Sequence, residues 1–269
     1  MESCLRSLFN LDYPSSKLQI IVVDGGSKDG TIEMLTHEFP QVHLVTENRK
    51  GVAIARNTGW KHSEGELIAY TDDDCIVDRN WIRTLVNTLG SNDAEGAGGP
   101  LIYLYREQIP DSYKGTPIGA FDLGGNQLQL KIGQNLITAN IIVKAEVFGK
   151  IRFFESLVYN DSEDAEFCRS ILESGGKLLY VPDAKVFHDI DARRINLHYI
   201  LKRSFFSGIT SYIIERKRKR NLSLIPKFLR YFLVGSFRFF LRRTVSDFYW
   251  FAKCFIAFLS SILLVFLWK

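Results

Sequence analysis

Residues 18–31, LQIIVVDGGSKDGT, join a run of apolar and β-branched side chains to a polar turn that contains three glycines. A short apolar run bounded by turn residues is typical of a strand buried on both faces. Two similar runs follow, VHLV at residues 42–45 and LIAY at residues 67–70. Helical patterns separate the three runs, at residues 31–39 and 52–63. This alternation predicts an α/β fold, a mostly parallel Rossmann-like sheet flanked by helices, up to about residue 189.

Composition limits the class of protein. With 269 residues, 46% of them hydrophobic, the chain can bury one large core, or one domain plus an appended segment. The net charge of +4 comes from basic residues in the last third, such as ERKRKR at residues 215–220, so we expect no nucleic-acid partner. Residues 1–10 lack the uninterrupted apolar core of a signal peptide. Four cysteines without a CxxC pair argue against a zinc site or a disulfide framework and fit a reducing compartment.

Carboxylates follow two of the predicted strands. Asp24 comes directly after the first run, and Asp72, Asp73 and Asp74 come directly after LIAY. Ligands of open α/β sheets bind beyond the carboxyl ends of the strands, where these side chains are expected. Clustered carboxylates offer hard oxygen ligands to Mg²⁺ or Mn²⁺, and the cation would offset their repulsion. The alternative interpretation of the triplet is a solvated acidic turn. The glycines after Asp24 match neither GxGxxG nor a P-loop, so they give no support to a dinucleotide or NTPase site.

Seven segments, in order and at characteristic spacing, resemble the family 2 glycosyltransferases, which have the GT-A fold. They are ESCLRSL, DYP, IIVVDGGSKDGT, GVAIARNTG, YTDDDC, TANIIVKAEVF and SEDAEFCRSILESGGKLLYVPDAKVFH. Together they span about residues 1–190. The resemblance implies transfer of a sugar from a nucleotide-diphosphate sugar donor, with Mg²⁺ or Mn²⁺ as cofactor. It also implies inversion at the anomeric carbon by single displacement, without a covalent nucleophile, so Cys75 and Cys168 are expected to be bystanders.

The resemblance also implies roles for the acidic residues on the donor side. Asp24 matches the residue that contacts the nucleotide base. Asp72 and Asp74 match the DxD element, which contacts the ribose and the metal-bound diphosphate, and Asp74 is the expected metal ligand. Asp73 occupies the variable middle place of that element and is counted with the donor-binding residues.

Four further residues are carried over from the family. Arg56 of ARN lies near the donor, and Asn140 of TANII belongs to a loop that lines the sugar or acceptor pocket. Asp164 of SEDAEF matches the catalytic base, which takes the proton of the acceptor hydroxyl. Its place at a predicted helix start allows a second interpretation as a helix cap, and the two roles are compatible. His188 matches a histidine near the metal or diphosphate, although a lone histidine is also commonly structural.

The chain departs from the family at its start. Relatives carry an apolar first strand before the helix that contains ESCLRSL, and this chain begins inside that helix. We therefore expect the first strand to be missing, at a cost to the neighbouring strand edges. A misplaced start, a fragment or a degraded relative would each explain this. A truncated pseudoenzyme that binds a sugar nucleotide without transfer is the alternative function. Nucleotidyl transfer is disfavoured, since the glycine- and basic-rich N-terminal loop it needs is absent.

The last third predicts membrane association. We divide the chain into a catalytic domain at 1–192, a helical basic linker at 193–224, and amphipathic and transmembrane helices at 225–269. Residues 248–268 form an apolar stretch with one charge, which is long enough to span a bilayer, with a buried core helix as the alternative. The preceding basic run places the catalytic domain on the cytoplasmic face of the membrane. The predicted helix at residues 195–220 lacks the QxxRW motif of processive synthases. We therefore expect one sugar transfer per encounter, to a saccharide or lipid-linked acceptor.

Overall fold

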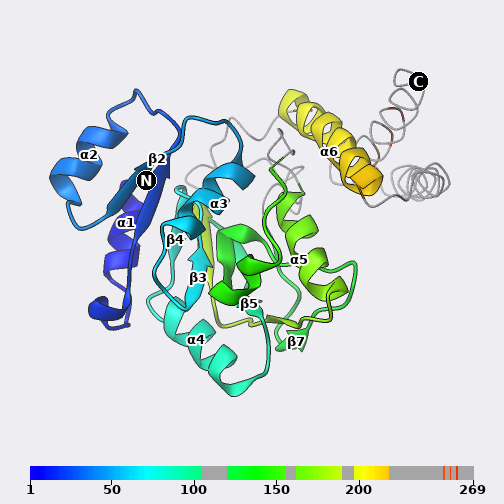
Figure 1. Ribbon diagram of the computed structural model, residues 1–269, viewed down its shortest axis with the longest axis horizontal. Coiled ribbons are helices and arrows are strands. Elements are labelled where there is room, and N and C mark those ends of the chain that lie inside the picture. Colours follow the sequence, from blue (N-terminus) through cyan, green and yellow to red (C-terminus); the bar gives the residue numbers. More distant parts are fainter. Residues whose placement is uncertain are drawn as a thin grey trace. The chain divides into compact units, whose positions relative to one another are not determined.

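The computed structural model describes residues 1–104, 120–155, 162–189 and 197–217, together with residues 251, 255 and 259 (Figure 1). The chain forms two compact units, each described by itself below. The first comprises residues 1–104 and 119–189, and the second comprises residues 105–118 and 190–269. Every residue predicted for the site belongs to the first unit.

The predicted order of elements in the N-terminal part of the first unit is confirmed. Three strands and two helices lie within a few residues of their expected places, after a first helix that contains ESCLRSL. In chain order they are α1 (Glu2–Phe9), β1 (Ile21–Asp24), α2 (Thr31–Glu38), β2 (His43–Thr46), α3 (Val52–Lys61) and β3 (Leu67–Tyr70). The apolar runs thus form short strands that end where the carboxylates begin.

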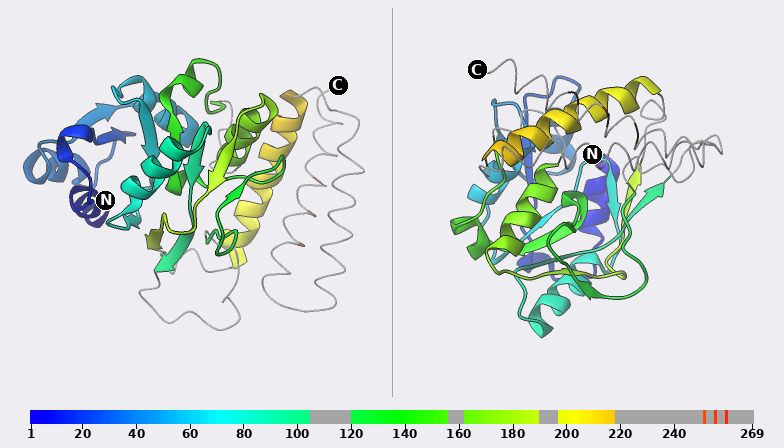
Figure 2. Two further views of the ribbon diagram at one scale, coloured as in Figure 1. Left: turned by 90° about the horizontal axis from the view of Figure 1, so that it is seen from below. Right: turned by 90° about the vertical axis from the view of Figure 1, so that its right-hand side faces the viewer.

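The rest of the first unit contains seven described strands and two α-helices of 11 residues each, seen from two further sides in Figure 2. The elements are β4 (Cys75–Val77), α4 (Trp81–Ser91), β5 (Gly96–Gly98), β6 (Leu101–Leu104), β7 (Leu128–Gln129), β8 (Ile141–Lys144), α5 (Glu163–Glu173), β9 (Leu178–Tyr180) and β10 (Val186–Asp189). The described strands of this unit, β1 to β10, form three sheets, in the orders β1-β2, β4-β10-β6 and β3-β8-β5-β9-β7.

The expectation of a mostly parallel sheet is wrong. Among the described strands, three pairings are parallel and four are antiparallel. Strand β8 lies between β3 and β5 and runs antiparallel to both. Its residues Ile141–Val143 are buried, and a strand covered on both faces has the same apolar pattern in either direction. The pattern therefore identified strands without giving their direction.

Strand β1 forms a sheet with β2 alone in the described part of the chain. The two strands are parallel and pair from Ile21 with His43 to Asp24 with Thr46. Helices α1 and α2 join them through a small cluster around Leu5, Leu35 and Phe39. These N-terminal elements are drawn in blue in Figure 1. That the family's first strand is missing stays a prediction.

Aromatic side chains fill the core against which α3 and α5 pack. Phe153 stacks on Phe167 of α5 with ring centroids 4.2 Å apart, and Phe148 stacks on Trp60 of α3 at 5.3 Å. Asn57 of α3 fastens this region further, since its amide group donates to the carbonyl oxygen of Phe153 (2.9 Å) and accepts from its N–H (3.1 Å). Helices α3 and α5 are thus held to one shared core.

The second unit contains one long described helix, α6 (Leu197–Lys217), which confirms the helix expected in the basic linker. None of the helices that the structure describes is both long and apolar enough to cross a membrane. The predicted amphipathic and transmembrane helices at 225–269 lie outside the described residues, apart from 251, 255 and 259.

A close backbone approach next to β5 predicts a strong effect of a single methyl group. A Cβ atom on Gly99 would collide with the carbonyl oxygens of Ala184 and Val181. Gly99→Ala should therefore lower the free energy of unfolding by about 1–3 kcal/mol, measured by urea denaturation. Gly90→Ala is the control, because that glycine lies in α4 with no atom within 4 Å of the added Cβ. It should raise stability by about 0.5–1 kcal/mol. Equal effects of the two variants would contradict this account.

Candidate functional site

The acidic triplet forms the turn between β3 and β4, and α1 supports it. The carbonyl oxygen of Asp72 accepts hydrogen bonds from the Cys75 N–H (3.1 Å) and from the Cys4 thiol (3.4 Å). Ser7 of α1 accepts from the N–H of Val77 in β4 (3.1 Å). Burial raises the pKa of Cys4 to about 12, so this thiol stays neutral and can donate. The first helix therefore fixes the backbone that carries the three carboxylates.

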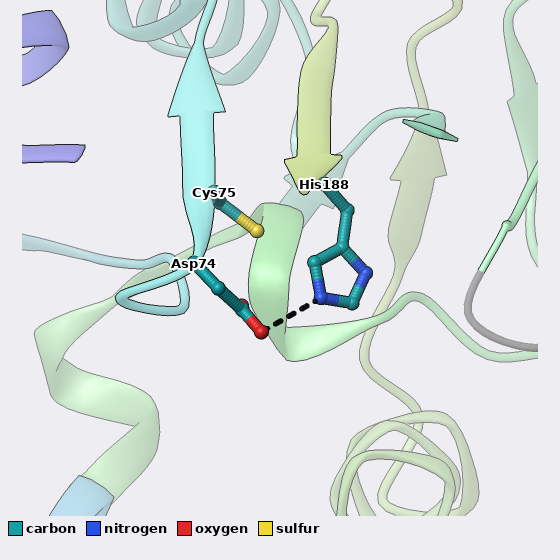
Figure 3. Close-up of side chains that lie close together, drawn as sticks. All are labelled: Asp74, Cys75 and His188. Atoms are coloured by element: carbon teal, nitrogen blue, oxygen red, sulfur yellow. Dashed lines mark ion pairs between the residues drawn. The ribbon is translucent and has the colours of Figure 1, made fainter. Parts of the chain in front are cut away.

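One end of this turn contributes to a group of side chains that could hold a metal ion, formed by Asp74, Cys75 and His188 (Figure 3). One ligand atom from each residue lies within 4.8 Å of the others. The group arises from strand pairing, because His188 of β10 is the register partner of Cys75 in β4. The Asp189 N–H also donates to the Asp74 carbonyl oxygen (2.9 Å), which draws the two strand ends together. Figure 3 shows the three side chains converging from the two neighbouring strands.

The imidazole of His188 fits a cation ligand. The residue is 8% exposed, and neither ring nitrogen makes a hydrogen bond within the described part of the chain. Its Nε2 atom lies 3.1 Å from Oδ2 of Asp74, close enough for a cation to contact both. A buried imidazole nitrogen that faces a carboxylate at this spacing suits a divalent cation with nitrogen and oxygen ligands.

Cys75 was not expected in this group. The residue is 1% exposed, and burial, followed by the nearby charges of Asp72 and Asp74, raises the pKa of its thiol. It was interpreted as a bystander because the reaction needs no covalent nucleophile. Its position directly after the acidic triplet, at the start of β4, was the signal that could have placed it beside Asp74.

A second group of charged side chains is centred on Arg56 of α3. Its Nη1 donates to Oε1 of Glu163 at 2.6 Å, and its Nη2 lies 3.4 Å from Oδ1 of Asp72. Burial opposes the positive charge, but Asp72 and Glu163 more than compensate, and the pKa of Arg56 is raised. Tyr70, at the end of β3, donates its hydroxyl to the Arg56 carbonyl oxygen (3.2 Å). Sequence analysis placed Arg56 near the donor residues and overlooked Glu163.

Asp164 lies in the first turn of α5, as predicted. Its Oδ1 accepts from the Ala165 N–H at 2.7 Å, within the first turn, whereas the residue at the cap position of α5 is Ser162, which makes no side-chain cap hydrogen bond. It is also near enough to Arg56 to help raise the pKa of that side chain. Ser162, just before the helix, has φ 69°, the one positive φ of a non-glycine residue in the described chain. The helix start that carries Asp164 therefore has unusual backbone geometry.

Asp24 is held by its own turn. Its carboxylate is 4% exposed and accepts from the N–H groups of Gly26 (2.8 Å) and Ser27 (3.1 Å). Gly26 has φ 91°, which a side chain would disfavour. Hydrogen bonds from Ser27 and then Gly26 keep the pKa of Asp24 below its usual value, against the effect of burial. The structure joins Asp24 to neither charged group by a hydrogen bond, and its contact with a nucleotide base stays a prediction.

Asn140 lies in the core. It is 0% exposed, and its Oδ1 accepts from the indole N–H of Trp81 (2.7 Å). Its amide nitrogen donates to the carbonyl oxygens of Pro100 (2.8 Å) and Ala184 (2.7 Å). The side chain is thereby used by the fold and does not face either charged group. We correct its expected place in the donor pocket to a structural one, because contact with a donor would require these bonds to break.

The remaining predicted residues divide between the two groups. Arg56, Asp72 and Asp164 belong to one, Asp74 and His188 to the other, and Asp73 lies between them in the turn. Comparison with known sequences identifies the family of the chain. Residues 1–151 match the family described as "Glycosyl transferase family 2". The chain belongs to glycosyl transferase family 2.

Family 2 relatives with assigned names match a large part of the chain. Glycosyltransferase AglE of Haloferax volcanii is 27% identical over 191 residues, covering 68% of this chain and 60% of AglE. Succinoglycan biosynthesis protein ExoM of Rhizobium meliloti is 28% identical over 223 residues, covering 77% and 68%. A glucosyl-dolichyl phosphate glucuronosyltransferase of Haloferax volcanii is 24% identical, covering 73% and 66%. The chain thus spans about two thirds of these relatives or slightly less.

Solved structures share the fold. S. aureus TarS in complex with UDP-GlcNAc gives a TM-score of 0.60 at 14% identity, covering 97% of this chain and 77% of that one. GalNAc-T7 with UDP, GalNAc and Mn²⁺ gives a TM-score of 0.57 at 16% identity, covering 77% and 44%. These likenesses confirm the expected GT-A fold of this family 2 chain.

The corrected role of Asn140 predicts a loss of stability. Asn140→Ala removes three buried hydrogen bonds and leaves the Trp81 N–H without its partner. The free energy of unfolding should fall by about 3 kcal/mol or more, measured by urea denaturation. Asn92→Ala is the control, since it removes one exposed hydrogen bond to Thr88 and should cost about 1 kcal/mol or less. A stable Asn140→Ala protein with weakened nucleotide binding would restore the original assignment.

Proposed function

We propose that the protein is a metal-dependent, inverting glycosyltransferase that moves one sugar per encounter from a nucleotide-diphosphate sugar to an acceptor hydroxyl. The observation that carries this proposal is the division of the carboxylates into two groups. Asp74 lies 3.1 Å from the buried imidazole of His188, and Asp164 follows Glu163, the residue that binds Arg56. In such a site one carboxylate can hold a cation that stabilises the departing diphosphate, and another can accept the proton of the attacking hydroxyl.

The donor side includes Asp24, Asp72 and Asp73, with Arg56 holding Asp72 in place. The nucleotide is proposed to be UDP, because TarS is described with UDP-GlcNAc and GalNAc-T7 with UDP. The turn contributes three carboxylates and the first turn of α5 contributes Glu163, Asp164 and Glu166, while the guanidinium of Arg56 contacts Asp72 and Glu163. The excess of negative charge would repel a diphosphate unless a cation accompanied it.

Asp74 and His188 would hold that cation, with Cys75 behind them. Their nitrogen and oxygen ligands favour Mn²⁺ over Mg²⁺, since Mg²⁺ prefers an all-oxygen set. GalNAc-T7 is described with Mn²⁺, which supports this choice. A bound divalent cation stabilises the charge that develops on the departing diphosphate.

Asp164 acts as the base on the acceptor side. Its carboxylate takes the proton of the acceptor hydroxyl while that oxygen bonds to the anomeric carbon. The bond from the anomeric carbon to the diphosphate oxygen breaks in the same displacement, and the nucleoside diphosphate leaves with the electron pair. The configuration at the anomeric carbon therefore inverts.

The acceptor is proposed to be a saccharide or lipid-linked glycan of the cell envelope, with the catalytic unit on the cytoplasmic face of the membrane. The names of two relatives, a succinoglycan biosynthesis protein and a glucosyl-dolichyl phosphate glucuronosyltransferase, support this class of acceptor. The apolar stretch at residues 248–268 supports the membrane location. Purified protein that glycosylates only soluble acceptors, and stays fully active without the residues after Pro226, would overturn both parts.

The role of Asp74 predicts metal-dependent donor binding. UDP with Mn²⁺ should raise the melting temperature of the detergent-solubilised full chain by about 5 °C at saturation, and Asp74→Asn should abolish the shift. GDP and dTDP are tested in parallel to identify the base. Asp93→Asn, whose side chain is 88% exposed, is the control and should retain the shift. A folded wild-type protein that no nucleotide shifts would contradict the proposal. Binding without turnover would favour a pseudoenzyme.

The role of Asp164 predicts separate effects on binding and chemistry. Asp164→Asn keeps the shape of the side chain and removes the base, so kcat for sugar transfer should fall by about 100- to 10,000-fold. The Mn²⁺-dependent thermal shift with UDP should stay unchanged, because Asp164 does not hold the donor. Loss of that shift, with kcat barely altered, would assign Asp164 to the fold or to the donor pocket instead.

A further inference from the structure

Glu163 is a buried carboxylate that the proposed reaction does not use. It is the first residue of α5 and is 7% exposed. The hydrogen bond that the structure gives it is the 2.6 Å contact from Nη1 of Arg56. Its second oxygen, Oε2, is buried and makes no hydrogen bond with any described residue. Arg56 is therefore the residue through which the Glu163 side chain is held in place.

The pair joins two distant parts of the chain. Arg56 lies in α3 and Glu163 begins α5, 107 positions later. Both side chains are about one tenth exposed, so water screens the interaction weakly. Buried ion pairs seldom add net stability, because desolvation offsets the attraction. Placing two elements in a fixed relation is a role that such a pair can still perform.

The backbone next to Glu163 needs such a restraint. Ser162 adopts φ 69°, a conformation that costs a non-glycine residue free energy and persists only where the surroundings enforce it. The first backbone hydrogen bond of α5 starts there, from the Glu166 N–H to the Ser162 carbonyl oxygen (3.0 Å). Asp164 lies between these two residues. A contact that holds Glu163 therefore restrains the turn that carries Asp164.

The same guanidinium reaches the donor side. While Nη1 binds Glu163, Nη2 lies 3.4 Å from the carboxylate of Asp72, and the Phe153 ring covers the group with its centroid 5.6 Å away. The fork of an arginine can hold two partners in fixed directions, which a lysine ammonium cannot. One side chain thus relates the acidic turn to the start of α5.

We propose that Glu163 is a positioning residue whose bond to Arg56 fixes the first turn of α5 and so aims the Asp164 carboxylate. The catalytic consequence rests on the proposed function, since it takes Asp164 to be the base. The structural half of the proposal is independent of any substrate. Glu163 itself contacts neither donor nor acceptor in this account.

Hydrogen exchange on the full-length protein tests the structural half. In Glu163→Gln and in Arg56→Met, the Glu166 amide should exchange at least about tenfold faster than in the wild type, because the turn is no longer held. The Arg56→Met/Glu163→Gln double variant should exchange no faster than either single variant. Glu173→Gln is the matched control, since it removes an ion pair with Arg169 (2.9 Å) at the other end of the same helix. It should leave the Glu166 amide unchanged.

Kinetics test the catalytic half. Glu163→Gln should lower kcat on the order of a hundredfold with little change in the KM of donor or acceptor, as expected for a misplaced base. In the Arg56→Met background the same substitution should cause no further fall. Removing both partners also avoids an uncompensated buried charge, so the double variant is expected to be at least as stable as either single variant.

The outcomes separate this proposal from the proposed function. Unchanged exchange of the Glu166 amide in Glu163→Gln, additive effects in the double variant, or a raised KM at constant kcat would each overturn the positioning role. A wild-type protein that neither binds UDP nor transfers sugar would overturn the proposed function instead. Hydrogen exchange would still decide whether Glu163 holds the turn through Arg56.

Discussion

A single buried guanidinium relates the parts of the site to one another. Arg56 contacts Glu163 at 2.6 Å and Asp72 at 3.4 Å, and these two carboxylates come from different segments, 107 and 16 positions away in sequence. A buried positive charge needs such partners, since burial without them is costly. Phe153 of the aromatic core lies against the Arg56 guanidinium, and the Tyr70 hydroxyl donates to the Arg56 carbonyl oxygen. Both contacts hold α3, the helix that carries Arg56. Electrostatics and packing therefore fix the same geometry.

The second group depends on strand pairing. Cys75 is the first residue of β4 and follows directly on Asp74. The antiparallel pairing of β4 with β10 puts His188 opposite Cys75. Helix α1 supports the turn through Cys4 and Ser7. The ligand atoms thus converge because three elements meet there, while each residue alone would be an ordinary strand or turn residue.

The amino-acid sequence predicted what depends on local pattern and on family likeness. The first three strands, the helix that starts at Glu163 and the acidic turn were placed to within a few residues. The direction of β8 was not predictable, because a strand buried on both faces has the same composition either way. Glu163 and Cys75 were missed and Asn140 was misplaced, since their roles come from contacts with residues 40 or more positions away.

The pairing of β4 with β10 also determines which changes this site can accommodate. Side chains alternate between the two faces of a strand, so a shift of one residue would turn His188 away from Asp74. Loops elsewhere in the unit can change length without altering this relation. A single-residue insertion or deletion within residues 75–77 or 186–189 would instead dismantle the ligand set while keeping every ligand in the sequence. A search for sequence motifs would still find all of them in such a protein. The pairing register of β4 with β10 is therefore a requirement for the site that is separate from the identity of its residues.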